Sequence, residues 1–188
     1  VTLDADYFVV HAGKAGKQSR EAALNKVAVG VEKILTLVPG RTRFLLENQA
    51  GAGTEIGGDP VHLSAILKTI NQPDRTGLCL DTCHAFAAGY DLRSKEGIDR
   101  LLAEVETTLG LEAIHLFHLN DALGELGSHL DRHTHIGEGR IGPEGFGLLL
   151  TDPRISALTG ILETPKTNPD DDLRNLSVVR RLAIGGAE

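Results

Sequence analysis

Short apolar runs alternate with longer amphipathic segments along the whole chain. A short apolar run bounded by turn residues is typical of a buried strand, and apolar residues spaced three or four apart are typical of a helix packed on one face. The predicted strands are 8–11, 44–47, 78–81, 114–119 and 160–163, and the predicted helices are 19–37, 59–70, 94–109, 143–150 and 170–182. Strands that alternate with helices predict an α/β fold with a parallel sheet.

Local signals support the boundaries of the first two helices. Ser19 is a good N-cap for the first helix, and Gly40 follows that helix as a stop. Asp59 and Pro60 combine an N-cap with proline at the first helical position, where a missing N–H costs nothing. These residues therefore indicate where each helix leaves its loop.

Acidic and histidine side chains stand at the ends of the predicted strands. His11, Glu47, Asp81, His118 and Glu163 lie at or near five successive carboxyl ends and are separated by 34 to 45 residues. In a TIM barrel those ends form the active-site face. The pattern therefore predicts a TIM (β/α)8 barrel, of which the chain contains about five of the eight βα units.

Histidine, aspartate and glutamate are the residue types that bind zinc, manganese or iron. Carboxylates can bridge two ions roughly 3.5–4 Å apart, which clamp the attacking and leaving oxygens in phosphoryl displacement. His84 lies three residues after Asp81, and Asp131 and His133 lie two residues apart in a loop that can aim both in one direction. The sequence thus predicts a metal centre with more than one ion.

Each of these residues also has a structural interpretation. A single histidine such as His11 is more often a hydrogen-bonded core residue, and Glu47 or Asp81 alone would more often cap a helix or form an ion pair. The segment 131–133 could be a solvated loop. The combined pattern at five strand ends favours the metal centre.

The remaining histidines are predicted to lie outside the ligand set. His115 should point to the side of its strand opposite His118, in a structural role, and His62 should lie on the surface of a helix. His129 and His135 are near the site and are candidates for orienting the ligands through hydrogen bonds.

Composition limits the class of protein. The 188 residues are 41% hydrophobic with a mean hydropathy of −0.07, which suits one globular domain. No apolar run approaches the roughly 18 residues of a membrane span. Cys79 and Cys83 are expected to be reduced thiols in a cytoplasmic protein, with metal ligation as the alternative.

The net charge of −7 argues against a phosphate-rich partner. This objection weakens if several acidic residues are metal ligands, because each divalent ion adds two positive charges at the site itself. An acidic protein can then still attract phosphate locally.

A glycine-rich stretch, 51–57, follows the second strand and resembles a dinucleotide-binding turn. Its spacing is GxGxxxG, whereas the dinucleotide fingerprint is GxGxxG, and no acidic residue closes the next strand in the ribose-binding manner. The glycines are therefore expected to allow tight turns beside the metals, and no nucleotide cofactor is expected.

Specific motifs make the chain resemble the endonuclease IV family of apurinic/apyrimidinic endonucleases. The resemblance covers nearly the whole chain, and the 13-residue motif at 79–91 is the most specific. The motifs are VHxG at 10–13, LLENQAGxG at 45–53, CLDTCHAFAAGYD at 79–91, HLND at 118–121, DRHxHIGEG at 131–139 and ILETP at 161–165.

This resemblance implies an eight-stranded barrel of the xylose isomerase-like type that acts as a monomer. It implies a DNA repair enzyme of base excision repair that cuts double-stranded DNA on the 5′ side of abasic sites and leaves a 3′-hydroxyl. It also implies three metal ions, usually Zn2+, with Mn2+ as an alternative.

Roles follow from the matched positions. Glu47 would bridge the first and second ions, and the catalytic residues would be Glu47, Asp81, His118 and Glu163. The implied ligands are His11 for the first ion, Asp81, His118 and Glu163 for the second, and His84, Asp131 and His133 for the third.

The resemblance also implies a difference at the front of the chain. Family members carry roughly three more βα units upstream, including another metal-binding histidine. We therefore expect residues 1–188 to be the C-terminal portion of a single barrel domain, and we expect this chain alone to be weakened or inactive.

Two alternatives remain from the sequence. Related barrels include metal-dependent sugar isomerases and epimerases, which usually use fewer ions and would not need the His84, Asp131 and His133 set. The other alternative is a fragment that binds metal or abasic DNA without cutting it.

Overall fold

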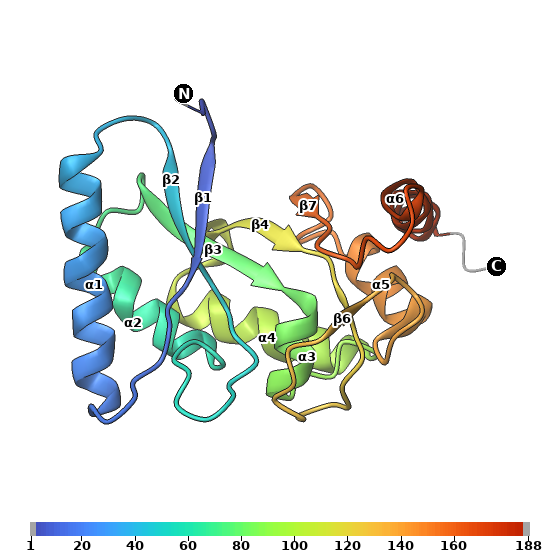
Figure 1. The fold of residues 1–188 in the computed structure, drawn as a ribbon, viewed down its shortest axis with the longest axis horizontal. Coiled ribbons are helices and arrows are strands. Elements are labelled where there is room, and N and C mark those ends of the chain that lie inside the picture. Colours follow the sequence, from blue (N-terminus) through green and yellow to red (C-terminus); the bar gives the residue numbers. More distant parts are fainter. Residues whose placement is uncertain (1–2, 186–188) are drawn as a thin grey trace.

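Five parallel strands form one open sheet in the computed structural model, which describes residues 3–185 (Figure 1). All neighbouring strands pair in parallel, and their order is β1–β2–β3–β4–β7. The strands are β1 (Tyr7–His11), β2 (Arg43–Glu47), β3 (Thr76–Asp81), β4 (Ile114–His118) and β7 (Thr159–Ile161). The five predicted strands are therefore confirmed, although β7 ends two residues before Glu163.

Helices connect the strands and bury the apolar residues on one face of the sheet. Ser19 Oγ accepts the backbone N–H of Ala22, and an Asp59 carboxylate oxygen accepts that of Val61, which confirms both predicted N-caps. The first helix ends at Leu37. The helices are α1 (Arg20–Leu37), α2 (Pro60–Ile70), α3 (Thr82–Ala88), α4 (Lys95–Thr108), α5 (Gly142–Thr151) and α6 (Asp171–Ala183), with a 3-10 turn at Leu111–Ala113.

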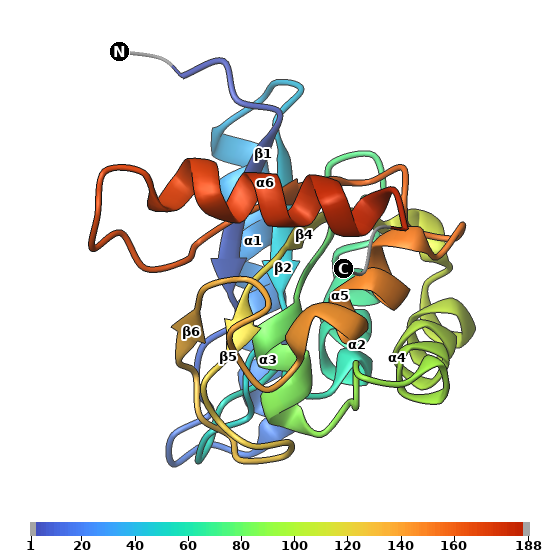
Figure 2. The same cartoon turned by 90° about the vertical axis from the view of Figure 1, so that its right-hand side faces the viewer.

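Two elements were not predicted from the sequence. Helix α3 begins directly after β3, with Asp81 as its N-cap, and six of its seven residues are buried. A two-stranded antiparallel hairpin, β5 (Asp121–Ala122) with β6 (His133–Thr134), lies within the segment expected to be a long loop. Figure 2 shows this hairpin beside α3, at the end of the sheet where the strands terminate.

The two faces of the sheet bury different residues. One face contributes Leu46 and Leu80 to the large core formed with the helices. The opposite, concave face holds a small separate cluster of Leu45, Cys79 and Leu116. Alternation along each strand therefore puts residues two positions beyond this cluster, such as Glu47 and Asp81, on the concave face at its carboxyl end.

A register shift in β4 corrects one prediction. The pairing of β3 with β4 shifts between Leu78 and Cys79, so that β4 has one extra residue at His115. His115 stacks on Tyr7 and its Nε2 lies 2.7 Å from Arg43 Nη1, so it lies on the concave face with His118, not on the opposite side as predicted. The bulge interrupts the simple alternation on which that prediction depended.

Among residues 3–185, each edge strand of the sheet pairs on one side only, β1 with β2 and β7 with β4. In the described part of the chain, no helix is long and apolar enough to cross a membrane. The assignment of residues 1–188 to one portion of a barrel domain stays a prediction.

Candidate metal centre

The eight residues predicted as metal ligands converge at the carboxyl ends of the strands. Their ligand atoms form overlapping groups in which all members lie within 4.8 Å of one another. Three groups contain only predicted ligands: His11, Glu47 and His84; Glu47, Asp81, His118 and Glu163; and His84, Asp131 and His133. The structure thus brings together all eight positions selected from the sequence.

Burial divides the centre into a floor and a rim. The floor consists of Glu47, Asp81, His84 and His118, all of which are buried. The rim consists of residues that reach solvent, since the side chain of Asp131 is 52% exposed and that of Glu163 is 46% exposed. A substrate would therefore approach from the rim while the floor stays inaccessible to bulk water.

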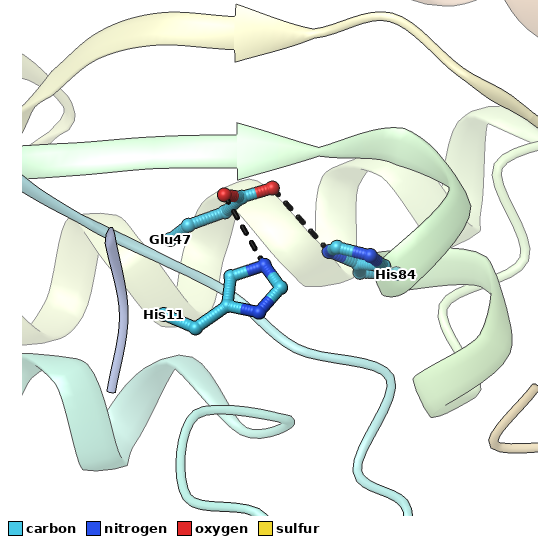
Figure 3. A group of neighbouring side chains, drawn as sticks. All are labelled: His11, Glu47 and His84. Atoms are coloured by element: carbon cyan, nitrogen blue, oxygen red, sulfur yellow. Dashed lines mark ion pairs between the residues drawn. The ribbon is translucent and has the colours of Figure 1, made fainter. Parts of the chain in front are cut away.

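Glu47 occupies the middle of the floor. Its Oε1 lies 2.9 Å from His118 Nδ1 and 3.5 Å from His84 Nδ1, and its Oε2 lies 3.3 Å from His11 Nε2. Figure 3 shows the carboxylate of Glu47 between the rings of His11 and His84. One carboxylate therefore faces different groups with its two oxygens, which is the arrangement that a bridging ligand requires.

The charges of the floor depend on one another. Burial raises the pKa of Glu47, but hydrogen bonds with His11 and His118 outweigh it and lower the pKa to about 2. Burial lowers the pKa of His118, but partners including Cys79, Glu163 and Glu47 raise it to about 12. Glu47 is therefore ionised at neutral pH, and its histidine neighbours compensate its negative charge.

His84 and His133 are oriented by backbone carbonyl groups. Nδ1 of His84 donates to the carbonyl oxygen of Asn48 at 2.9 Å, and Nδ1 of His133 donates to that of Glu163 at 3.2 Å. A carbonyl can only accept, so each Nδ1 carries a proton, and Nε2 is the ring nitrogen that could coordinate a metal ion. The two Nε2 atoms lie 3.1 and 3.3 Å from the same oxygen of Asp131.

The donor set fits divalent cations. Among residues 3–185, the ion pairs of Glu47, Asp81, Asp131 and Glu163 are all with histidines. Burial raises the pKa of Asp81, so its charge is expensive without a cation. Within residues 3–185, His133 Nε2 is buried without a hydrogen-bond partner, which suits a nitrogen that coordinates a metal ion.

Side-chain amides extend the pairing between neighbouring strands past the strand ends. Asn48 Oδ1 accepts the N–H of Asp81 at 2.6 Å, and Asn48 Nδ2 donates to the carbonyl of Asp81 at 3.0 Å. Gln49 Oε1 accepts the N–H of Gly13 at 3.0 Å. These amides fix the backbone where the ligands begin, and sequence reasoning assigned them no role although they follow Glu47 directly.

Both cysteines are free and buried, as the sequence predicts for reduced thiols. Burial raises the pKa of Cys79 to about 11 and that of Cys83 to about 12. Cys83 Sγ lies within 4.8 Å of ligand atoms of Asp81 and His133, but a raised pKa disfavours the thiolate that metal ligation needs.

The other histidines contact no predicted ligand through the hydrogen bonds of their rings. His129 Nδ1 bonds the carbonyl of Ala50 at 2.7 Å, and His135 Nδ1 bonds Nδ2 of Asn175 at 3.0 Å. They therefore tie loops and α6 to the site, and do not orient a ligand directly. His62 lies in α2 as predicted and is half-buried.

Residues 1–181 match the family model described as xylose isomerase-like TIM barrel. The chain therefore belongs to the xylose isomerase-like TIM barrel family, which confirms the predicted fold class.

The chain is also similar to endonuclease IV proteins. It is 43% identical over 185 residues to a probable endonuclease 4 from Methanosphaerula palustris, a match that covers 97% of this chain and 65% of that protein. It is 37% identical to endonuclease IV from Thermus thermophilus, whose structure superposes with a TM-score of 0.81 over 96% of this chain and 62% of that chain. The resemblance to the endonuclease IV family is confirmed.

A D-tagatose 3-epimerase-like protein also superposes, with a TM-score of 0.73 over 97% of this chain and 64% of that chain, but only 21% identity. That likeness shows the shared fold alone. The chain spans 65% of the length of the Methanosphaerula relative.

Proposed function

We propose that this chain provides most of the active site of a metal-dependent DNA repair endonuclease that hydrolyses the phosphodiester bond 5′ to abasic sites. The observation that supports this proposal most strongly is the third group, His84, Asp131 and His133, beside the group centred on Glu47. Several adjoining groups of this kind suit the displacement of a phosphodiester oxygen, in which charge develops on both the attacking and the leaving oxygen.

The ligands are proposed by position. Glu47 would bridge the first and second ions, with His11 on the first. Asp81, His118 and Glu163 would complete the second, and His84, Asp131 and His133 would hold the third, with Zn2+ as the proposed metal and Mn2+ as the alternative. Bound divalent ions would neutralise the phosphate charge and stabilise the oxygens that gain charge in the transition state.

The acidic side chains have different proposed roles on the floor and on the rim. Glu47 and Asp81 supply negative charge on the buried floor when a cation is bound there. Glu163 lies on the rim, and its Oε2 is held 3.1 Å from His118 Nδ1, where it can accept a hydrogen bond from the attacking water. The hydrogen bond with His118 lowers the pKa of Glu163, which keeps that carboxylate ionised as an acceptor.

The test is incision of a duplex that carries one stable abasic analogue, with a label at the 5′ end of the damaged strand. We expect a zinc-dependent, chelator-sensitive product that ends before the lesion in a 3′-hydroxyl, which a DNA polymerase can extend. An undamaged duplex is the control for lesion specificity, and gel filtration of the protein checks the proposed monomer.

A second protein distinguishes two explanations for an absence of incision: that the proposed function is wrong, or that this chain needs further βα units to be active. It is a fusion of this chain to the upstream βα units that the endonuclease IV resemblance implies, taken from the Thermus thermophilus relative. Zinc-bound protein that fails to incise in both forms would contradict the proposed endonuclease. Conversion of a ketose by the same protein would instead support a sugar epimerase.

A further inference from the structure

Asn120 is completely buried beside the floor of the metal centre and follows Leu119 at the end of β4. Its Nδ2 donates to Asp81 Oδ2 at 2.5 Å and to Glu163 Oε2 at 3.3 Å. Its Oδ1 accepts the backbone N–H of Glu163 at 2.8 Å. One side chain therefore contacts two carboxylates, one at the end of β3 and one in the segment that follows β7.

The orientation of this amide is determined by its surroundings. The N–H of Glu163 can only donate, so the atom that faces it must be the amide oxygen, and the NH2 group must face the carboxylates. Thr82 holds the backbone of Asn120 from the other side, because its Oγ1 accepts the N–H of Asn120 at 2.9 Å and donates to its carbonyl at 2.7 Å. Asn120 therefore cannot turn without breaking several buried hydrogen bonds.

We propose that Asn120 is a positioning residue that aligns Asp81 and Glu163 as ligands of the second ion. This inference rests on the proposed metal centre. Two carboxylates within 4.8 Å repel each other, and they would separate if nothing held them. The NH2 group of Asn120 gives one hydrogen bond to each, which keeps both at the site before an ion arrives and fixes their oxygens when it is bound.

The substitution Asn120→Asp tests this role with little change in shape. It keeps an oxygen that accepts the N–H of Glu163, and it removes the donor that faces Asp81 and Glu163. Outer hydrogen-bond partners of metal ligands typically contribute about 10- to 100-fold in metal affinity. We expect N120D to bind one zinc ion weaker by about that factor in competition with a chromogenic chelator.

Asn175→Asp is the matched control, because Asn175 is a buried asparagine with the same hydrogen-bonding pattern away from the ligands. Its Oδ1 accepts the N–H of Ile136 at 2.9 Å, and its Nδ2 donates to the carbonyl of Asp171 at 2.8 Å. N175D should lower the melting temperature and leave zinc affinity unchanged. The absorption spectrum of bound Co2+, which reports ligand geometry, should change in N120D and not in N175D.

The outcomes separate this inference from the function on which it rests. A wild-type chain that binds neither Zn2+ nor Co2+ would overturn the proposed metal centre and the role of Asn120 together. A wild-type chain that binds both ions, with N120D identical in affinity and spectrum, would overturn the role of Asn120 alone.

A measurement on the wild-type protein covers the case in which N120D does not fold. In 15N-labelled protein, the side-chain NH2 resonances of Asn120 should shift during zinc titration and exchange more slowly with solvent, while those of Asn175 stay unchanged. Asn120 resonances that do not respond to bound zinc would contradict the proposal.

Discussion

The two ends of the concave face give histidines opposite properties. His118, at the carboxyl end of β4, lies between Glu47 and Glu163, and its pKa is raised to about 12 because hydrogen bonds with Cys79, Glu163 and Glu47 outweigh burial. His115, at the amino end of the same strand, lies against Arg43. Burial and the Arg43 charge both lower the pKa of His115.

The difference shows that residue type alone does not make a ligand. Both histidines lie on one strand and one face, but among the described residues only His118 belongs to a close group of possible ligands, with Glu47, Asp81 and Glu163. At the amino end the ring of His115 instead contacts Tyr7 and the guanidinium of Arg43, whose positive charge would repel a metal ion. A metal-ligating histidine is therefore defined by its neighbours, which belong to other strands.

The largest effect on incision should come from removing the charge of Glu47, at the carboxyl ends of the strands. Glu47→Gln keeps the shape of the side chain and removes the charge proposed to bridge two ions. The single-turnover rate of incision of the abasic duplex should fall by about 10²–10³-fold or more. The rate is measured on this chain or on its fusion to the upstream units, whichever is active. Glu125→Gln, on an exposed residue that pairs with Arg140, should keep the wild-type rate. Normal cutting by E47Q would disprove the bridge assignment.

Paired substitutions on β4 compare the two ends directly. His118→Gln should lose or strongly weaken the binding of one metal ion, because it removes a proposed ligand. His115→Gln should keep the full metal content and cost about 1 kcal/mol of unfolding free energy through the lost contact with Arg43. Metal analysis after dialysis and urea unfolding measure the two quantities. Equal metal loss in both variants would contradict the distinction.

At the amino end of the sheet, the ring of His115 occupies space that a side chain at position 77 would fill. A Cβ added at Gly77 would lie 2.3 Å from Cδ2 of His115 and 2.9 Å from the carbonyl oxygen of Ala113. Gly77→Ala should therefore destabilise the chain by about 1–3 kcal/mol in urea unfolding. Gly30→Ala is the control, because it lies in α1 with open space around it and should stabilise by about 0.5–1 kcal/mol. A stable G77A would show that His115 moves freely.

The smallest effect is a difference in pH dependence. Because the pKa of His115 is lowered in the folded state, the unfolded chain binds this proton more readily. The contribution of His115 to the free energy of unfolding is therefore fully present above the unfolded pKa of about 6.5, where the ring is neutral in both states. It is lost as pH falls through that value. In chelator-treated protein, wild type should lose more stability than H115Q between about pH 7.5 and 5.5. The opposite order would contradict the shift.

Much of the fold was predictable because its signals are local. The apolar runs that end in His11, Glu47, Asp81 and His118 fall within one or two residues of the observed strands. Ser19 and Asp59 cap helices as predicted, since a side chain that accepts a nearby N–H needs no tertiary contact. The convergence of the eight proposed ligands was also predictable, because parallel strands bring their carboxyl ends together.

The missed features depend on contacts between distant segments. Helix α3 is short and buried on nearly every side, so its sequence has no amphipathic period. The bulge at His115 arises from pairing with β3, and strand alternation alone gave the wrong side. The role proposed for Asn120 requires Asp81 and Glu163 to meet, and they are far apart in sequence.

The amides of Asn48 and Gln49 have a consequence for how such a site can evolve. Asn48 ties the first residue after β2 to the end of β3, and Gln49 ties the loop after β2 to Gly13 in the loop after β1, so the proposed ligands at these strand ends lie on a fixed backbone. Insertions or exchanges further along the loop can then alter what the rim admits without disturbing the buried floor. These hydrogen bonds therefore separate a rigid buried floor from loops that can change on the rim.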